Sequence, residues 1–173
     1  MKILIVNLEK EEKSSAFLKK TLPIFFGNET IVFPETVKIS LNCFSRLRHQ
    51  WDAKKILSEA KEKLKDEKDA GFHTLLVFPY DLYAGTSKSV FGVAELNGSF
   101  ALISTFRLGA LENENHSSKI FKKRILMEAV HALGHTYGVE HCTNRQCVMG
   151  VSKNIPQIDR KNNYFCKKCV SLL

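Results

Sequence analysis

Apolar runs alternate with amphipathic segments along the chain, and this alternation predicts an α/β fold. Lys2–Leu8 and His73–Pro79 are apolar runs typical of buried strands. Residues 31–39 hold two shorter runs on either side of Pro34, which favours an edge strand or a broken one. The sequence therefore predicts a sheet with at least two buried strands.

A β-hairpin is predicted near the middle of the chain. The strand-like runs Val90–Leu96 and Phe100–Phe106 flank Asn97 and Gly98. Asn-Gly between two such runs is a strong short-range hairpin signal, because both residues tolerate the positive φ that tight hairpin turns require. We expect one strand of this hairpin to lie at an edge of the sheet.

Two helices are predicted in the first half of the chain. Ser14 and Ser15 can cap one that runs from about Ala16 to Phe25 and is interrupted by Pro23. The other covers Gln50–Lys68, where one stripe is apolar and the rest is charged. We interpret that charged face as solvated and not as a binding patch.

A longer helix is predicted over Ser117–Gly138. Its apolar side is formed by Ile120, Ile125, Leu126, Ala129, Val130 and Leu133. Gly138 is placed to end it, as a glycine does at a helix C-terminus. Periodicity then vanishes, and residues 141–169 hold four cysteines, which suits a segment ordered by metal and not by a core of its own.

The composition fits one globular domain over residues 1–173. The chain is 44% hydrophobic and 25% charged, and its 26 Lys and Arg against 18 Asp and Glu give a net charge of +8. No apolar run approaches the ~20 residues of a membrane-spanning helix. The apolar start Ile3–Val6 is too short for a secretory signal. We therefore expect a cytoplasmic protein with no membrane partner, in a compartment where thiols stay reduced.

Three histidines form a candidate metal site. His131 and His135 are four residues apart, so a helix places both imidazoles on one face. Gly138 lets the backbone reverse, so that His141 can return to the same point. Three imidazoles with a fourth position open are typical of a catalytic zinc site, and H-x-x-x-H-x-x-G-x-x-H is the metzincin spacing.

Position 132 departs from that motif. Metzincins have Glu directly after the first histidine, where it acts as the general base, and this chain has Ala132. Glu128 and Glu140 stand at −3 and +9 from His131 and do not obviously replace it. Two explanations compete, a naturally inactive relative and a deliberate Glu-to-Ala change. We favour the second, because every other motif position is intact.

Four of the five cysteines form a second candidate metal site. Cys142 and Cys147 make one pair, and Cys166 and Cys169 make the other after eighteen intervening residues. Two such pairs predict a closed, tetrahedral structural zinc site, with an iron–sulfur cluster as the lesser alternative. Cys43 lies outside the pattern, and we interpret it as an ordinary buried thiol.

The combined pattern of residues 131–142, Cys147-Val148-Met149 and residues 166–169 closely resembles the archaemetzincins, a family of metzincin-type zinc peptidases. Weaker support comes from Asp81-Leu82-Tyr83, Val90-Phe91-Gly92 and Arg107-Leu108. The resemblance implies a mixed twisted sheet with an antiparallel edge strand along the cleft. It also implies that Met149 is the Met-turn methionine, an apolar floor beneath the three histidines.

These observations predict two parts within one domain. Residues 1–140 form the sheet and the helices, including the active-site helix, and residues 141–173 form the Met-turn and the zinc-binding cysteine segment. We expect two zinc ions per monomeric chain and a peptide or protein substrate, held by main-chain pairing to the edge strand. A non-catalytic peptide-binding protein is the alternative.

Nucleic-acid binding is a weaker hypothesis. Residues 142–173 carry a formal charge of +5, from six basic residues and Asp159. A four-thiolate zinc site contributes about −2, so the excess is explained by charge compensation. Stacking aromatics are not interleaved with these basic residues, as single-strand binding would require.

Overall fold

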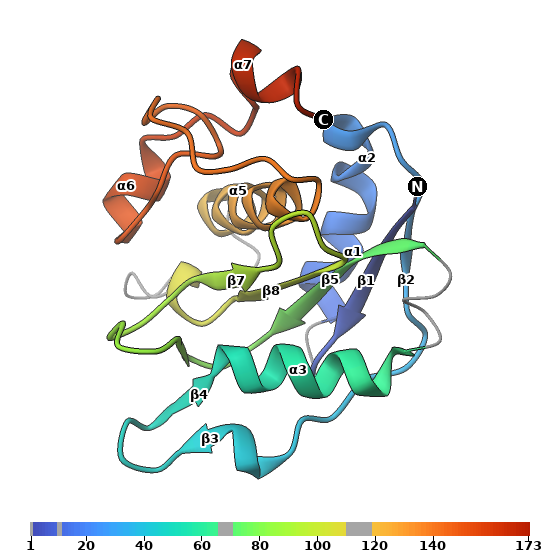
Figure 1. Cartoon of the computed structure of the whole chain (residues 1–173), viewed down its shortest axis with the longest axis vertical. Helices are drawn as coiled ribbons and strands as arrows, with labels where there is room; N and C mark the ends of the chain where they lie inside the picture. The colour runs from blue at the N-terminus through green and yellow to red at the C-terminus, as the bar shows by residue number, and fades with distance from the viewer. Residues whose placement is uncertain (1, 10–11, 66–70, 110–118) are drawn as a thin grey trace.

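The computed structural model describes residues 2–9, 12–65, 71–109 and 119–173. Within them, the central sheet has the strand order β2-β1-β5-β8-β7 (Figure 1). Its strands are β1 (Lys2–Asn7), β2 (Thr30–Val32), β5 (Phe72–Phe78), β7 (Gly92–Ala94) and β8 (Phe100–Ser104). β7 pairs antiparallel with β8, and all the other neighbours are parallel. The predicted mixed sheet with an antiparallel edge strand is confirmed.

Helices cover both faces of this sheet. On one face lie α1 (Glu12–Thr21), α2 (Pro23–Phe26) and α5 (Lys119–Thr136), and on the other lies α3 (Ala53–Lys63) (Figure 1). Successive residues of a strand point to opposite faces, so Leu75 joins the core under α5 while Leu76 joins the core over α3. Burial on both faces explains why β1 and β5 are continuous apolar runs.

The predicted serine cap of the first helix is wrong. α1 begins at Glu12, upstream of both serines, and Ser14 and Ser15 are buried inside it. The Ser15 hydroxyl donates a hydrogen bond to Oδ1 of Asn7, at the end of β1. A tertiary contact, and not the helix terminus, therefore uses this hydroxyl.

The predicted start of the second helix, at Gln50, is also wrong. Gln50–Asp52 form β4, which joins β3 (Phe44–Ser45) and β6 (Leu82–Tyr83) in a small second sheet. The Asp52 carboxylate then caps α3 by accepting hydrogen bonds from the amides of Lys54 and Lys55. The predicted end at Lys68 lies outside the described residues.

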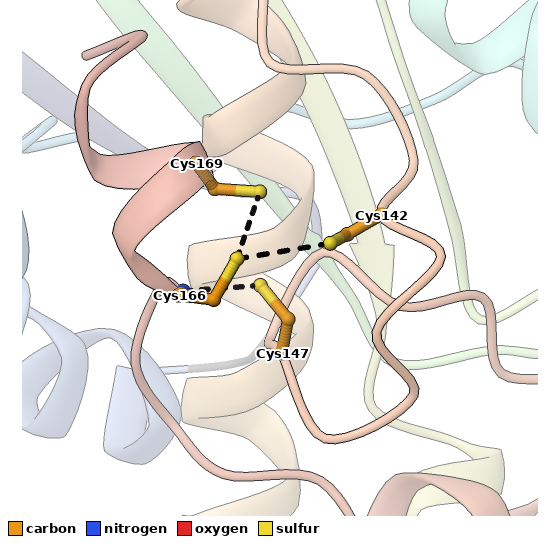
Figure 2. A group of neighbouring side chains, drawn as sticks. All are labelled: Cys142, Cys147, Cys166 and Cys169. Atoms are coloured by element: carbon orange, nitrogen blue, oxygen red, sulfur yellow. Dashed lines mark hydrogen bonds between the residues drawn. The ribbon is translucent and has the colours of Figure 1, made fainter.

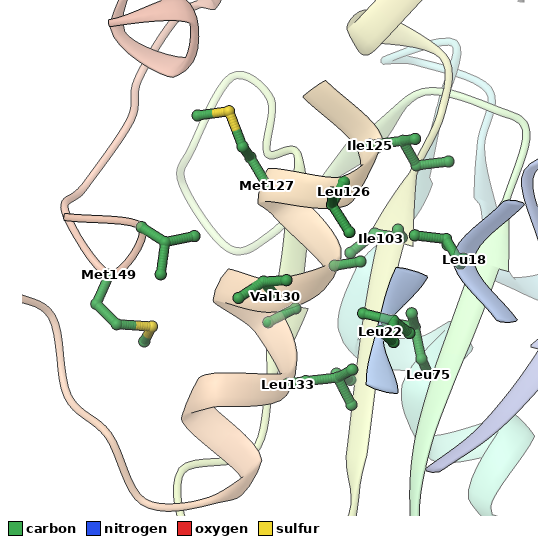
Figure 3. Close-up of a cluster of buried hydrophobic side chains, with 14 of the residues drawn as sticks. Leu18, Leu22, Leu75, Ile103, Ile125, Leu126, Met127, Val130, Leu133 and Met149 are labelled. Atoms are coloured by element: carbon green, nitrogen blue, oxygen red, sulfur yellow. The ribbon is translucent and has the colours of Figure 1, made fainter. Parts of the chain in front are cut away.

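α5 is buried on almost every side from Arg124 to Thr136, because the sheet covers one side and the C-terminal segment covers the other (Figure 1). Figure 3 shows the apolar core between α5, α1 and the strands, with Met149 on the far side of the helix. Ile120 is 49% exposed, so its predicted place on the apolar side is wrong. The predicted first residue, Ser117, lies outside the described part of the chain.

The segment after α5 covers the side of that helix that faces away from the sheet. It includes two short helices, α6 (Ile155–Asp159) and α7 (Lys167–Val170) (Figure 1). The buried Arg124 of α5 donates to both carboxylate oxygens of Asp159, at 2.8 and 2.9 Å, which fixes α6 against α5. In the described residues, no helix is long and apolar enough to cross a membrane.

Candidate active site and metal centres

The three predicted histidines converge at the C-terminal end of α5. Nε2 of His131 lies 3.2 Å from Nε2 of His135, and the ring of His141 is centred 4.7 Å from that of His135 and 5.3 Å from that of His131. One nitrogen of each ring can be chosen so that all three lie within 4.8 Å of one another. The predicted helical spacing and chain reversal are therefore both present.

Gly138 produces the reversal. Its φ is +85°, and two hydrogen bonds close the helix end, from the Gly138 amide to the His135 carbonyl and from the Val139 amide to the Gly134 carbonyl. This is a Schellman arrangement, in which a left-handed residue ends the helix. Val139 is then fully buried, which directs the following turn back towards α5 and positions His141.

Replacing Gly138 by Ala is expected to destabilise the fold by about 1–2 kcal/mol, because a Cβ is strained at positive φ. It should also weaken zinc binding at the histidines by displacing His141. Gly27→Ala is the matched control, since Gly27 ends α2 at φ +64° with open space around it. Thermal unfolding and zinc titration would check this, and an equal zinc loss in both variants would contradict it.

Backbone carbonyls orient two of the imidazoles. Nδ1 of His131 lies 2.9 Å from the carbonyl oxygen of Val148, and Nδ1 of His135 lies 2.9 Å from that of Val139. A carbonyl only accepts, so each Nδ1 carries the hydrogen and each Nε2 presents a lone pair to the centre. Burial lowers the pKa of His131 well below its usual value and also lowers that of His135. Both rings are therefore neutral at pH 7, the form that binds metal.

The histidine group fits zinc in its donor chemistry. Nitrogens held about 2.0–2.1 Å from a tetrahedral zinc ion lie about 3.3–3.4 Å apart, close to the 3.2 Å between His131 and His135. A groove of about 1070 Å³ opens beside the three rings. Ala132, at the position of the metzincin general base, lines the same groove and brings no titratable group. The site is open on one side, as substrate access requires.

Met149 packs against α5 at Gly134, one residue before His135. It is fully buried, and a Cβ added to Gly134 would lie 2.6 Å from its sulfur. Gly134 is therefore the residue that lets Met149 approach the helix so closely. The neighbouring Val148 carbonyl is the acceptor for His131, so the same turn carries the methionine and orients a histidine.

The four predicted cysteines lie together (Figure 2). Sγ of Cys166 is 3.8 Å from that of Cys142 and 3.7 Å from that of Cys169, and the Cys166 amide donates to Sγ of Cys147 at 3.3 Å. All four sulfurs fall within 4.8 Å of one another. Sulfurs bound 2.3 Å from a tetrahedral zinc ion would be about 3.8 Å apart, so the cluster fits this ion.

The thiol environments differ within this cluster. The backbone amide of Cys169 lowers the pKa of Cys166 to about 7, while burial raises the pKa of Cys169 and of Cys147. Cys142 pairs with Gly150 through an isolated bridge, and its amide donates to the Met149 carbonyl at 2.9 Å. Cys142 also directly follows His141, so the two candidate metal centres share one stretch of backbone.

The remaining cysteine and histidines stay outside both centres. Cys43 is buried, as predicted, and its thiol donates to Glu59 at 3.3 Å. Nδ1 of His73 lies 2.8 Å from the Thr136 hydroxyl, and its ring stacks on Tyr137 behind α5. His116 lies outside the described residues.

Two charged residues that the sequence did not single out together meet beside the histidines. Nζ of Lys161 lies 3.9 Å from Oε1 of Glu128, and both side chains are buried and line the groove. The sequence does place Glu128 on the predicted helix, about one turn before His131. Lys161 comes after α6, and no pattern around it predicts that its side chain reaches α5.

The fold, the three converging histidines and the four clustered cysteines are together typical of a zinc metallopeptidase with a three-histidine site. A profile of peptidase family M54 matches residues 19–173. The archaemetzincin of Archaeoglobus fulgidus is 36% identical over 171 residues, which cover 99% of this chain and 98% of that protein. The archaemetzincin of Methanopyrus kandleri is 34% identical over 84% of this chain and 78% of its own length.

Solved structures agree with these relatives. The Archaeoglobus fulgidus archaemetzincin, crystallised with malonate, superposes with a TM-score of 0.85 over 100% of both chains at 36% identity. A zinc-dependent peptidase from Methanocorpusculum labreanum superposes with a TM-score of 0.86 over 99% of both chains at 25% identity. This chain belongs to peptidase family M54, the archaemetzincins.

Proposed function

We propose that this chain is an archaemetzincin-type zinc peptidase whose proton-transfer step is disabled by Ala132. The convergence of three oriented imidazoles in an open groove is the observation that supports this. Zinc held by these imidazoles would supply a Lewis acid, able to polarise a peptide carbonyl and to lower the pKa of a water. His131, His135 and His141 are the ligands, and the carbonyls of Val148 and Val139 hold two of them in the required tautomer.

The missing step is proton transfer. A general base in this position takes a proton from the attacking water and delivers it to the leaving amine. The methyl group of Ala132 can do neither, so the chain would bind substrate without cleaving it at an appreciable rate. A deliberate Glu-to-Ala change and a naturally non-catalytic peptide-binding protein both account for this residue. Glu at codon 132 of the encoding gene would select the first.

The substrate in this proposal is an extended peptide. β7 is the last strand of the central sheet, and Gly92, Val93 and Ala94 line the groove that holds the histidines. An edge strand offers unpaired main-chain groups to which a peptide can add. The Asn97 amide donates to the His135 carbonyl at 2.9 Å, which ties the hairpin loop to the end of α5 and keeps this edge beside the metal ligands.

The cysteine cluster has a structural role in this proposal. The second zinc ion of this proposal is held by the four cysteines, Cys142, Cys147, Cys166 and Cys169. It anchors the C-terminal segment over α5. Met149 forms an apolar floor on the helix side of the three histidines. The monomeric state, the cytoplasmic location and the division at residues 140 and 141 stay predictions.

Metal analysis tests the two-site proposal directly. We expect two zinc ions per chain, of which a mild chelator removes one while the circular dichroism spectrum is unchanged. The open histidine site should release its ion first, because the four-thiolate site is closed to water. His135→Ala is the matched variant and should retain one zinc ion. Loss of both ions together with unfolding, or a chain prepared without chelators that holds no zinc, would contradict the proposal.

A further inference from the structure

Glu128 and Lys161 form a buried charge pair in the wall of the groove. Glu128 is on α5, three residues before His131 and four before Ala132, so its side chain belongs to the stripe that carries the metal ligands. Lys161 reaches the same place from beyond α6. The two side chains are 8% and 1% exposed, respectively, so bulk solvent does not satisfy their charges.

The pair is incompletely hydrogen-bonded. Nζ of Lys161 donates to the Val148 and Gly150 carbonyls at 3.1 and 2.9 Å, and an ammonium has three hydrogens. The 3.9 Å from Nζ to Oε1 of Glu128 is too long for a hydrogen bond. Among the described residues, Oε1 of Glu128 has no hydrogen-bond partner. Glu128 and Lys161, which both line the groove, therefore leave one acceptor and one donor unsatisfied 3.9 Å apart in its wall.

A second polar atom in the same groove is also unsatisfied. Oγ of Ser152 is buried and has no hydrogen-bond partner within the described residues, and Ser152 lines the groove. Such atoms are rare in native proteins, because a buried polar group that loses its hydration is normally compensated by a hydrogen bond. Four are found in the described part of the chain, and two of them line the groove. This concentration points to a polar ligand group that completes their hydrogen bonds.

We propose that Glu128 and Lys161 are specificity-determining residues that bind the carboxamide of an Asn or Gln side chain in the peptide. The carboxamide oxygen would accept from Nζ of Lys161, and its NH₂ would donate to Oε1 of Glu128. The pair has no net charge, whichever partner holds the proton, so a charged side chain finds no counter-charge there. An apolar side chain leaves both groups unsatisfied.

Peptide binding to the zinc-loaded chain tests this. Fluorescein-labelled pentapeptides that carry Gln, Glu, Lys or Leu at one position in turn would be titrated by fluorescence anisotropy. At one position, the Gln peptide should bind at least about tenfold more tightly than the Leu, Glu and Lys peptides. Equal affinity for Gln and Leu at every position would overturn the proposal, as would the absence of measurable binding.

Two charge variants separate recognition from a structural role. Glu128→Gln leaves the site with a positive charge and should shift preference about tenfold from Gln towards Glu. Lys161→Gln leaves it with a negative charge and should shift preference towards Lys. The exposed pair Lys2–Glu29 supplies the controls Lys2→Gln and Glu29→Gln, which should change neither preference. If Lys161→Gln fails to fold, Glu128→Gln and the unmodified chain still decide, and an unchanged preference overturns the proposal.

This inference rests on the proposed binding of peptides in the groove, yet it does not depend on catalysis. Cleavage by Ala132→Glu without any carboxamide preference would remove the subsite and leave the peptidase. Carboxamide-selective binding in a chain that Ala132→Glu cannot activate would remove the peptidase and leave the subsite. The two failures are therefore distinguishable.

Discussion

Ala132→Glu is expected to cleave peptides about 10²–10⁴-fold faster than the chain with Ala132, the usual contribution of a positioned general base. Ala132 already lines the groove with His131 and His135, so a carboxylate at position 132 would lie in the groove that holds the histidines. Hydrolysis of a broad peptide library, followed by mass spectrometry, measures the gain.

Two controls connect that gain to the proposed chemistry. Ala132→Gln has the size of Glu but cannot carry the proton, so it should stay near the rate of the Ala132 chain. A chelator should abolish the activity of Ala132→Glu, and zinc should restore it. The double variant Ala132→Glu, His135→Ala should be inactive even when zinc is added. A zinc-loaded Ala132→Glu chain that cleaves nothing in the library would favour the peptide-binding alternative.

Cys166→Ser is expected to disorder the segment from residue 142 to the C-terminus. Structural zinc sites contribute roughly 10–16 kcal/mol of apparent binding free energy in zinc-finger peptides, and three thiolates would leave one position of the tetrahedral ion open. The helices α6 and α7 have five and four residues, which is too short for them to stay folded without the stabilisation that zinc supplies. Limited proteolysis should cut within residues 142–173, and His141 should lose its place because it adjoins Cys142.

Cys43→Ser is the matched control for this prediction. Cys43 is also buried, yet it lies outside the cluster. Its thiol donates a hydrogen bond to Glu59, and a serine hydroxyl can donate the same bond. The control should keep its zinc and its resistance to protease. A Cys166→Ser chain that resists protease as well as the control does would contradict a structural metal site at the cysteines.

The sequence by itself determined the features that depend on short-range geometry. Residues four apart on a helix share a face, and a glycine at the helix end permits positive φ, so the meeting of His131, His135 and His141 could be predicted. The four-cysteine site could be predicted in the same way, since two closely spaced cysteine pairs are typical of a structural zinc site. The predicted antiparallel pairing on either side of Asn97 and Gly98 is present, but of these two residues only Asn97 has a positive φ, of +53°.

Only the tertiary structure decided the features that depend on partners distant in sequence. The sequence predicts Ser15 as a helix cap, whereas in the structure its hydroxyl donates to Asn7. It predicts Gln50–Asp52 as helical, whereas these residues form a strand that pairs with β3 and β6. Glu128 and Lys161 are 33 residues apart and meet because the C-terminal segment packs over one side of α5 (Figure 1). Periodicity reports which side of an element is buried, whereas the identity of a partner depends on how the whole chain packs.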